Sequence, residues 1–155
     1  MSYSKINEDV LKSLGPETQF AKDIEKMWGV ELRKDVMMGR QDFSEIDYMI
    51  IQPNTDEVLG YIELKNRTIS STMYKTLMIN HKKMIALRTQ HTYSKKPVFL
   101  GLRYTDLDLY YEVNLGHSFK IEHNGRTLNT RSKYDIRQVE HLPLKHFRKI
   151  KKRGN

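Results

Sequence analysis

Residues 44–65 read SEIDYMIIQ-PNTDE-VLGYIELK. The first and last parts of this stretch are rich in the β-branched and aromatic residues that favour strands. The middle part, residues 53–57, has turn chemistry, because Pro fixes its own φ angle and the Asn and Asp side chains can hydrogen-bond to the local backbone. The stretch therefore predicts a β-hairpin of two antiparallel strands.

The register of this hairpin decides which side chains meet. If the turn is centred on Thr55, Asp47 faces Glu63 and Gln52 faces Val58. Directly opposed residues of an antiparallel pair point to the same side of the sheet, and side chains along one strand repeat every second residue. Asp47, Glu63 and Lys65 are therefore expected on one face, near one end of the hairpin.

Two carboxylates and an ammonium in one place point to chemistry. Folding gains little from such a cluster, because the desolvation of partly buried charges offsets their attraction. Two carboxylates supply the hard oxygen ligands that Mg²⁺ prefers, and the ion keeps positions for water and a substrate phosphate. A neighbouring Lys can orient or deprotonate the attacking water and stabilise charge on phosphorus. The alternative is a solvated edge where Glu63 and Lys65 form a surface ion pair, worth ~0–1 kcal/mol.

Asp47 followed by Glu63-Leu64-Lys65 across a hairpin resembles the active-site motif of the PD-(D/E)XK nuclease superfamily, which has the restriction-endonuclease-like fold. The sequence departs from the motif at one position, because Ile46 stands where the Pro of the motif would be. The resemblance implies a Mg²⁺ or Mn²⁺ ion held by Asp47, by Glu63 and by the backbone carbonyl of Leu64. It implies that Lys65 orients the attacking water.

A helix is predicted between Pro16, which suits a first helical turn, and Gly29, which suits a helix end. In resolvase-like members of the superfamily a Glu on the first helix reaches the metal site, and Glu17 matches that position in order and context. Glu17 is thus a candidate catalytic residue and metal ligand. The alternative is an acid that complements the helix dipole, worth ~0.3–1 kcal/mol, and the sequence leaves both open. The expected apolar face of this helix comprises Phe20, Ile24, Met27 and Trp28.

The remaining pattern predicts an α/β (α+β) fold, in which a central mixed β-sheet is flanked by helices, with a restriction-endonuclease-like core. Asn80 is a plausible N-cap for a helix over residues 81–92, and a longer helix that begins near Tyr74 is the alternative. Either helix would carry the chain to a buried parallel strand. Asn124-Gly125 is a strong hairpin signal, and the strands around it are expected to extend the sheet. The further strands are expected at residues 30–34, 96–104, 108–114 and 118–122. The whole chain, residues 1–155, is expected to be a single nuclease domain with a core over about residues 14–105 and C-terminal strands and a basic tail over residues 106–155.

The charge of the chain predicts a polyanionic partner. Its 155 residues include 27 Lys and Arg against 19 Asp and Glu, a formal net charge of +8. Such an excess favours nucleic acid, and with the nuclease motif the expected partner is DNA. The alternatives are a solvated basic face on the second helix and a disordered solubilising end at the C-terminus. The candidate nucleic-acid contacts are Arg40, Arg67, Lys82, Lys83, Lys149, Lys151 and Lys152.

Several other classes of site are not supported by the sequence. The chain has no Cys, so it has neither disulfides nor thiolate metal sites. Its six His show no His-x-x-His spacing, and there is no glycine-rich phosphate loop. No apolar run approaches the ~20 residues that cross a bilayer, and the N-terminus lacks a secretory signal. We therefore expect no membrane partner and a cytoplasmic location, in the host cytoplasm if the protein is phage-encoded.

These features together predict a Mg²⁺-dependent nuclease that hydrolyses phosphodiester bonds in nucleic acid. Among such nucleases, they favour a DNA endonuclease. The compact size, the helix beginning Gly-Pro-Glu and the basic tail are similar to those of phage nucleases and Holliday-junction resolvases. That similarity implies branched DNA as the substrate and a homodimer as the active form. The alternative is a non-catalytic nucleic-acid-binding module with the same fold.

Overall fold

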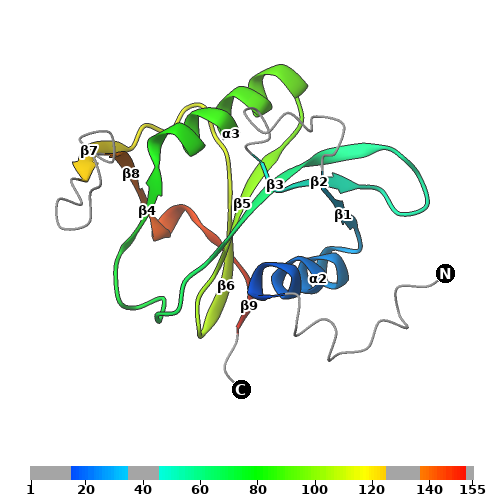
Figure 1. The fold of residues 1–155 in the computed structure, drawn as a ribbon, viewed down its shortest axis with the longest axis horizontal. Coiled ribbons are helices and arrows are strands. Elements are labelled where there is room, and N and C mark those ends of the chain that lie inside the picture. Colours follow the sequence, from blue (N-terminus) through cyan, green and yellow to red (C-terminus); the bar gives the residue numbers. More distant parts are fainter. Residues whose placement is uncertain (1–14, 35–45, 125–136, 153–155) are drawn as a thin grey trace.

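The computed structural model describes residues 15–34, 46–124 and 137–152. Within these ranges, no helix is both long and apolar enough to cross a bilayer. The elements shown in Figure 1 are, in chain order, α2 (Pro16–Trp28), β1 (Glu31–Arg33), β2 (Tyr48–Ile51), β3 (Val58–Asn66), β4 (Thr76–Asn80), α3 (His81–Ser94), β5 (Val98–Arg103), β6 (Leu107–Glu112), β7 (Lys120–Asn124), β8 (Arg137–Pro143), the short 3-10 helix η3 (Leu144–His146) and β9 (Arg148–Lys152).

The larger sheet is mixed, with its strands in the order β1-β2-β3-β5-β6-β9. The pair β3–β5 is parallel, and the other neighbours in this sheet are antiparallel. The connection between β3 and β5 runs through β4 and α3, which is the predicted helical crossover. Helix α2 lies on one side of the sheet and α3 on the other (Figure 1). The predicted fold class, a mixed sheet flanked by helices, is confirmed.

The two faces of this sheet carry different cores. Ile62 of β3 belongs to a buried cluster with Phe20 of α2, whereas Leu100 of β5 belongs to a second cluster with Met84 of α3. Glu63 follows Ile62 in the strand and pairs with Leu100 across the parallel ladder. Because side chains alternate along a strand, Glu63 points to the α3 side of the sheet.

The predicted hairpin is present, and its register agrees with the prediction over most of its length. Tyr48 pairs with Ile62 and continues the expected register, but a β-bulge between Ile50 and Ile51 makes Ile51 pair with Val58. The predicted pairing of Gln52 with Val58 is therefore wrong. The backbone N–H of Gln52 instead donates to the carbonyl of Glu57 at 3.0 Å, inside the turn. The bulge lies at the turn end of the hairpin, so the pairing beside Glu63 is unaffected.

Helix α2 has the predicted ends but a different exposed face. Gly29 adopts φ 65°, the left-handed conformation that suits a glycine after a helix. Phe20 is fully buried, but Met27 is 45% exposed, so its predicted place in the core is wrong. Trp28 is half-buried and packs edge-on against Phe99 of β5. The buried stripe therefore ends in an aromatic contact instead of a methionine.

The sequence predicted that the strands after the crossover extend one sheet. This prediction is wrong for two of them. β7 and β8 join β4 in a separate three-stranded sheet, in the order β4-β8-β7. Asn124 pairs with Arg137, so the expected tight Asn-Gly turn is also wrong. The residues that connect this pair, 125–136, lie outside the described ranges.

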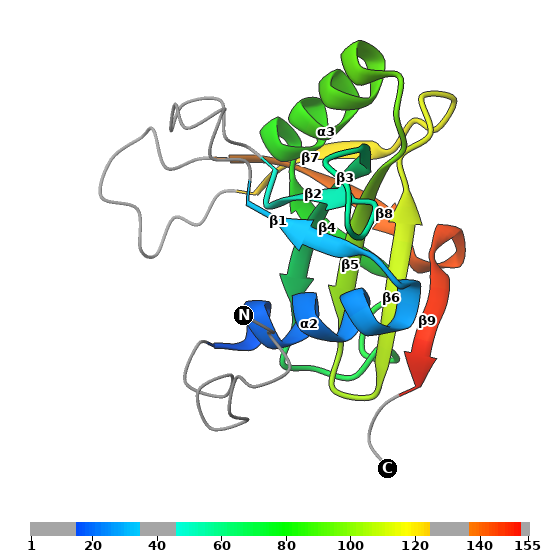
Figure 2. The ribbon, with the colours of Figure 1, turned by 90° about the vertical axis from the view of Figure 1, so that its right-hand side faces the viewer.

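The C-terminal third is part of the main core. Leu109 and Tyr111 of β6, Leu142 of β8 and Phe147 after η3 belong to the buried cluster on the α3 side. β9 pairs with β6 at the edge of the larger sheet, as Figure 2 shows. The alternative of a disordered basic end is therefore wrong for Arg148–Lys152.

Candidate active site

Asp47 and Glu63 are held together by a reciprocal pair of hydrogen bonds. The backbone N–H of Leu64 donates to Oδ2 of Asp47 at 2.9 Å, and the backbone N–H of Asp47 donates to Oε1 of Glu63 at 3.2 Å. Asp47 lies just before β2 begins, and Glu63 lies inside β3 with 3% of its surface exposed. The hairpin register therefore brings the two carboxylates together beside the first residue of β2, as the sequence predicted.

Two lysines flank the buried carboxylate of Glu63. Nζ of Lys65 lies 3.6 Å from Oε2, and Nζ of Lys83 lies 3.3 Å from Oε1. Lys65 shares the face of Glu63 because it is two residues further along the same strand. Lys83 comes from the first turn of α3, whose start is fixed by Asn80, because Oδ1 of Asn80 accepts a hydrogen bond from the backbone N–H of Lys82 at 2.8 Å. The capped helix thus delivers its third residue to the site.

Glu17 approaches the site from α2. Burial, a hydrogen bond with Asp47 and the charge of Asp47 together raise the pKa of Glu17 above its usual range. Its carboxylate also lies 3.9 Å from Nζ of Lys34, which stands over the ring of Tyr48 at 4.3 Å from the ring centre. Glu17 is therefore both an acid of the first helical turn and a neighbour of Asp47. Lys34 was missed by the sequence analysis, because it carried no signal beyond ending a predicted strand.

The two lysines do not fully stabilise the negative charge of Glu63 beside Asp47. Burial first, and then the charge of Asp47, raise the pKa of Glu63 to about 7, against the opposing effect of Lys83 and Lys65. A buried carboxyl that gives up its proton only near neutral pH favours binding of a cation, because the cation replaces the proton and restores the charge balance.

The donor atoms fit a hard divalent cation. Asp47 and Glu63 each keep one oxygen, Oδ1 and Oε2, outside the backbone hydrogen bonds described above. The carbonyl of Leu64 points to the same side of β3 as its N–H, toward Asp47, since both groups of one residue face the same neighbour in an antiparallel pair. β2 begins with the pair Tyr48–Ile62, so it does not extend to this carbonyl.

A site of two carboxylates and one carbonyl suits Mg²⁺, which keeps several waters and is held by one or two carboxylates in phosphate-processing enzymes. Over the ranges that the structure describes, no three His, Cys, Asp or Glu side chains are grouped to hold a metal ion. Glu17 therefore lies beside Asp47, but Glu17, Asp47 and Glu63 do not form a metal-binding group of three carboxylates.

Mg²⁺ binding is expected to strengthen with pH up to about 7 and then to level off. Glu63 would bind a metal ion as the ionised carboxylate, and its pKa is raised from 4.5 to about 7. Below that value the ion must displace a proton, so the Kd for Mg²⁺ should fall about tenfold for each unit of rising pH. Isothermal titration calorimetry between pH 5.5 and 8.5 measures this slope. Glu57→Gln, in the exposed turn, serves as the control with an unchanged slope, and a Kd independent of pH below 7 would contradict the assignment.

The predicted nucleic-acid contacts are not all brought to this site. Lys83 is at the site, whereas Lys82 points to solvent from the neighbouring helix position. Arg67 lies two residues beyond Lys65, where its guanidinium donates to the carbonyls of Asn66 and Met78. Arg40 lies outside the described ranges. Lys149, Lys151 and Lys152 belong to β9, three strand positions away from β3 in the sheet order.

Comparison with known families gave one match. A family model described as phage putative PDDEXK endonuclease matches residues 11–150. Neither the curated proteins nor the solved structures gave a match. The matched segment includes the two carboxylates, the lysines that flank them and both sheets except the last two residues of β9.

Proposed function

Because the chain belongs to the phage putative PDDEXK endonuclease family, we propose that it is a divalent-metal-dependent DNA endonuclease whose active site is built on Asp47, Glu63 and Lys65. The observation that carries this proposal is the reciprocal hydrogen bonding of Asp47 and Glu63, with a lysine ammonium on each side of Glu63. Such a cluster is costly for folding and matches what phosphodiester hydrolysis requires.

The residues divide the work of hydrolysis between them. When bound, Mg²⁺ or Mn²⁺ would lower the pKa of a water molecule and neutralise phosphate charge. Asp47, Glu63 and the Leu64 carbonyl are the groups that would hold the ion. The oxygen of water forms a bond to phosphorus, the bond from phosphorus to one sugar oxygen breaks, and that oxygen leaves with a proton. Lys65 orients the water and stabilises the negative charge that develops on the phosphate.

The other charged groups have supporting roles in this proposal. Lys83 holds the carboxylate of Glu63 in place and adds positive charge where a substrate phosphate would approach. Glu17 assists by its hydrogen bond to Asp47, which orients that carboxylate. The net charge of +8 favours a nucleic-acid substrate. We expect the enzyme to act as a homodimer on branched DNA in the host cytoplasm.

A panel of substrates tests the proposal. Cruciform DNA, linear duplex DNA, single-stranded DNA and RNA are incubated with the protein in Mg²⁺, Mn²⁺ or EDTA, and products are resolved on denaturing gels. Cleavage of DNA that requires metal and disappears in Lys65→Ala is the expected result. Binding without cleavage by either version, unchanged by EDTA, would contradict it and favour the non-catalytic binding module. The ratio of cruciform to linear cleavage separates branched from ordinary duplex specificity.

A further inference from the structure

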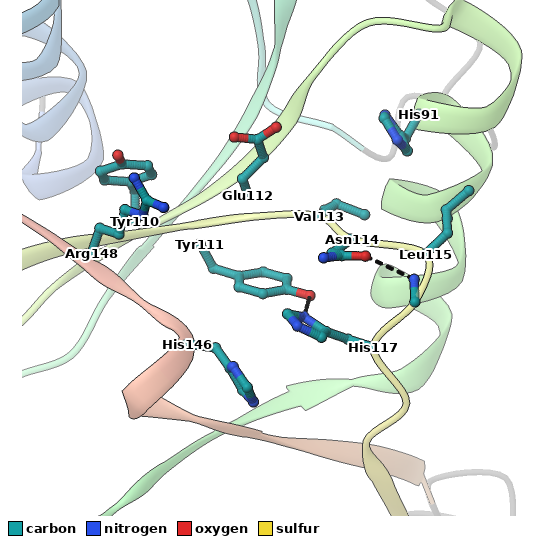
Figure 3. Close-up of a pocket in the computed structure, with 11 residues that line it drawn as sticks. His91, Tyr110, Tyr111, Glu112, Val113, Asn114, Leu115, His117, His146 and Arg148 are labelled. Atoms are coloured by element: carbon teal, nitrogen blue, oxygen red, sulfur yellow. Dashed lines mark hydrogen bonds between the residues drawn. The ribbon is translucent and has the colours of Figure 1, made fainter.

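A second polar cavity lies on the β6–β9 side of the molecule. It has a volume of about 620 Å³ and is bordered by the C-terminal half of α3, the end of β6, the loop that follows β6, η3 and the start of β9. Figure 3 shows His91 of α3 on one side of it and the rings of Tyr111, His117 and His146 on the other. Its volume is in the range of ligand-binding pockets. The catalytic proposal uses none of these side chains.

A hydrogen bond fixes the tautomer of one histidine of the cavity. Nδ1 of His91 lies 2.8 Å from the carbonyl oxygen of Lys96, which can only accept, so Nδ1 carries the proton and Nε2 is an acceptor in the neutral ring. The hydroxyl of Tyr111 lies 2.8 Å from Nδ1 of His117 and holds that ring in place, and either of the two atoms can be the donor. The cavity therefore offers Nε2 of His91 as an imidazole acceptor, beside the anchored ring of His117.

Aromatic rings form a continuous wall beside these groups. The rings of Tyr111 and His117 are stacked with centres 5.7 Å apart, and the ring of His146 lies 4.4 Å from that of His117. Phe119 and Phe147 pack behind them. Burial and the neighbouring His117 and Lys145 lower the pKa of His146, so its ring is neutral at neutral pH. A neutral, buttressed ring is a surface on which a planar group can stack.

The rim of the cavity continues into the basic strand β9. Arg148 lines the cavity, and Lys149 and Lys151 follow it along the exposed edge of the larger sheet. Glu112 is the acid on this rim. A planar wall, an imidazole acceptor and a run of cations together match a base attached to a phosphate backbone.

We propose that this cavity binds one nucleotide unit, with its base stacked on His146 and hydrogen-bonded by His91, and with its phosphate beside Arg148. The proposal rests on the proposed function in one respect, which is that the nucleotide belongs to the nucleic acid that the enzyme acts on. Glu63 pairs with Leu100, and Leu100 pairs with Tyr111. The cavity wall and the catalytic carboxylate thus start from the same face of the sheet, two strands or about 10 Å apart.

The test measures binding in EDTA, where cleavage plays no part. A single-stranded oligonucleotide carrying 2-aminopurine reports stacking by loss of fluorescence, and fluorescence anisotropy gives its Kd. Wild type is expected to quench the probe. His146→Ala is expected to weaken binding by about 5- to 150-fold, the range found for loss of one base–aromatic contact. Arg148→Gln is expected to weaken binding by loss of a phosphate contact. His123→Ala, an exposed histidine on β7, is the matched control and should bind as wild type.

A second measurement identifies the source of the nucleotide. Titration with dAMP, followed by the NMR signals of the His ring protons, detects a free mononucleotide in the cavity. Shifts in His117 and His146 support a mononucleotide site, and shifts seen only with the oligonucleotide support a site for the bound strand. No quenching, or equal affinities for wild type, His146→Ala and Arg148→Gln, would overturn the inference. Loss of cleavage activity alone would not, because the binding assay contains no metal.

Discussion

Asp47→Asn is expected to reduce metal-dependent cleavage by about 10²- to 10³-fold or more while the fold remains intact. The amide oxygen of Asn can still accept the hydrogen bond from the Leu64 N–H, which Asp47 now accepts at 2.9 Å. That orientation turns the amide NH₂ group toward the place where the cation would bind. The substitution therefore removes a ligand and its charge but keeps the hydrogen bond that fixes the hairpin end.

The measurement is the cleavage rate at saturating DNA and Mg²⁺, together with the urea concentration at half-unfolding. Asp56→Asn is the matched control, because Asp56 is an exposed acid in the turn of the same hairpin and its carboxylate contacts Arg33 at 3.1 Å. It should cleave at the rate of wild type. Cleavage by Asp47→Asn within tenfold of wild type, with both proteins folded, would remove Asp47 from the proposed active site.

Arg88→Met is expected to lower the free energy of unfolding by about 3–5 kcal/mol, the effect of removing one partner of a buried ion pair. Glu140 of β8 is 1% exposed. Its carboxylate accepts hydrogen bonds from the two terminal guanidinium nitrogens of Arg88 and lies 2.6 Å from Nδ1 of His81. Burial alone would raise the pKa of Glu140, but these hydrogen bonds outweigh it and lower the pKa. Without Arg88 the charge of Glu140 is left in the interior with one partner.

Two comparisons make this prediction specific. Arg88→Met combined with Glu140→Leu should recover most of the stability, because no uncompensated charge remains. The defect of Arg88→Met alone should shrink as the pH falls toward 5, because an unpaired buried carboxyl takes up a proton more readily and loses its charge. Urea unfolding at pH 5 and pH 7 measures both effects. A double variant no more stable than Arg88→Met would show that α3 is held to the second sheet mainly by other contacts.

The sequence was sufficient to place Asp47, Glu63 and Lys65 together because the pattern of the hairpin is local. Strand pairing is set by the turn and by alternation, and a register error of one residue would have exposed the apolar side chains. The bulge at Ile50 and Ile51 was not predictable, because it depends on how the turn residues hydrogen-bond. The choice between Lys82 and Lys83 required the true start of α3, which the Asn80 cap supplies.

Features that depend on distant segments could not be predicted. Lys34 meets Glu17 only because β1 and α2 pack side by side. β7 and β8 look like further strands of one sheet, and only their pairing with β4 shows a second sheet. The histidines of the cavity come from α3, the loop after β6 and η3, so no spacing in the sequence joins them. Long-range packing, not local pattern, decides each of these.

The position of the metal tests the central claim most directly. Crystals of the full chain soaked in Mn²⁺ and measured at the manganese absorption edge locate the ion by its anomalous scattering. We predict a peak between the carboxylates of Asp47 and Glu63, at about 2.0–2.2 Å from an oxygen of each, and no such peak in Asp47→Asn. A wild-type peak elsewhere, such as among the histidines of the second cavity, or no peak at all, would contradict the account.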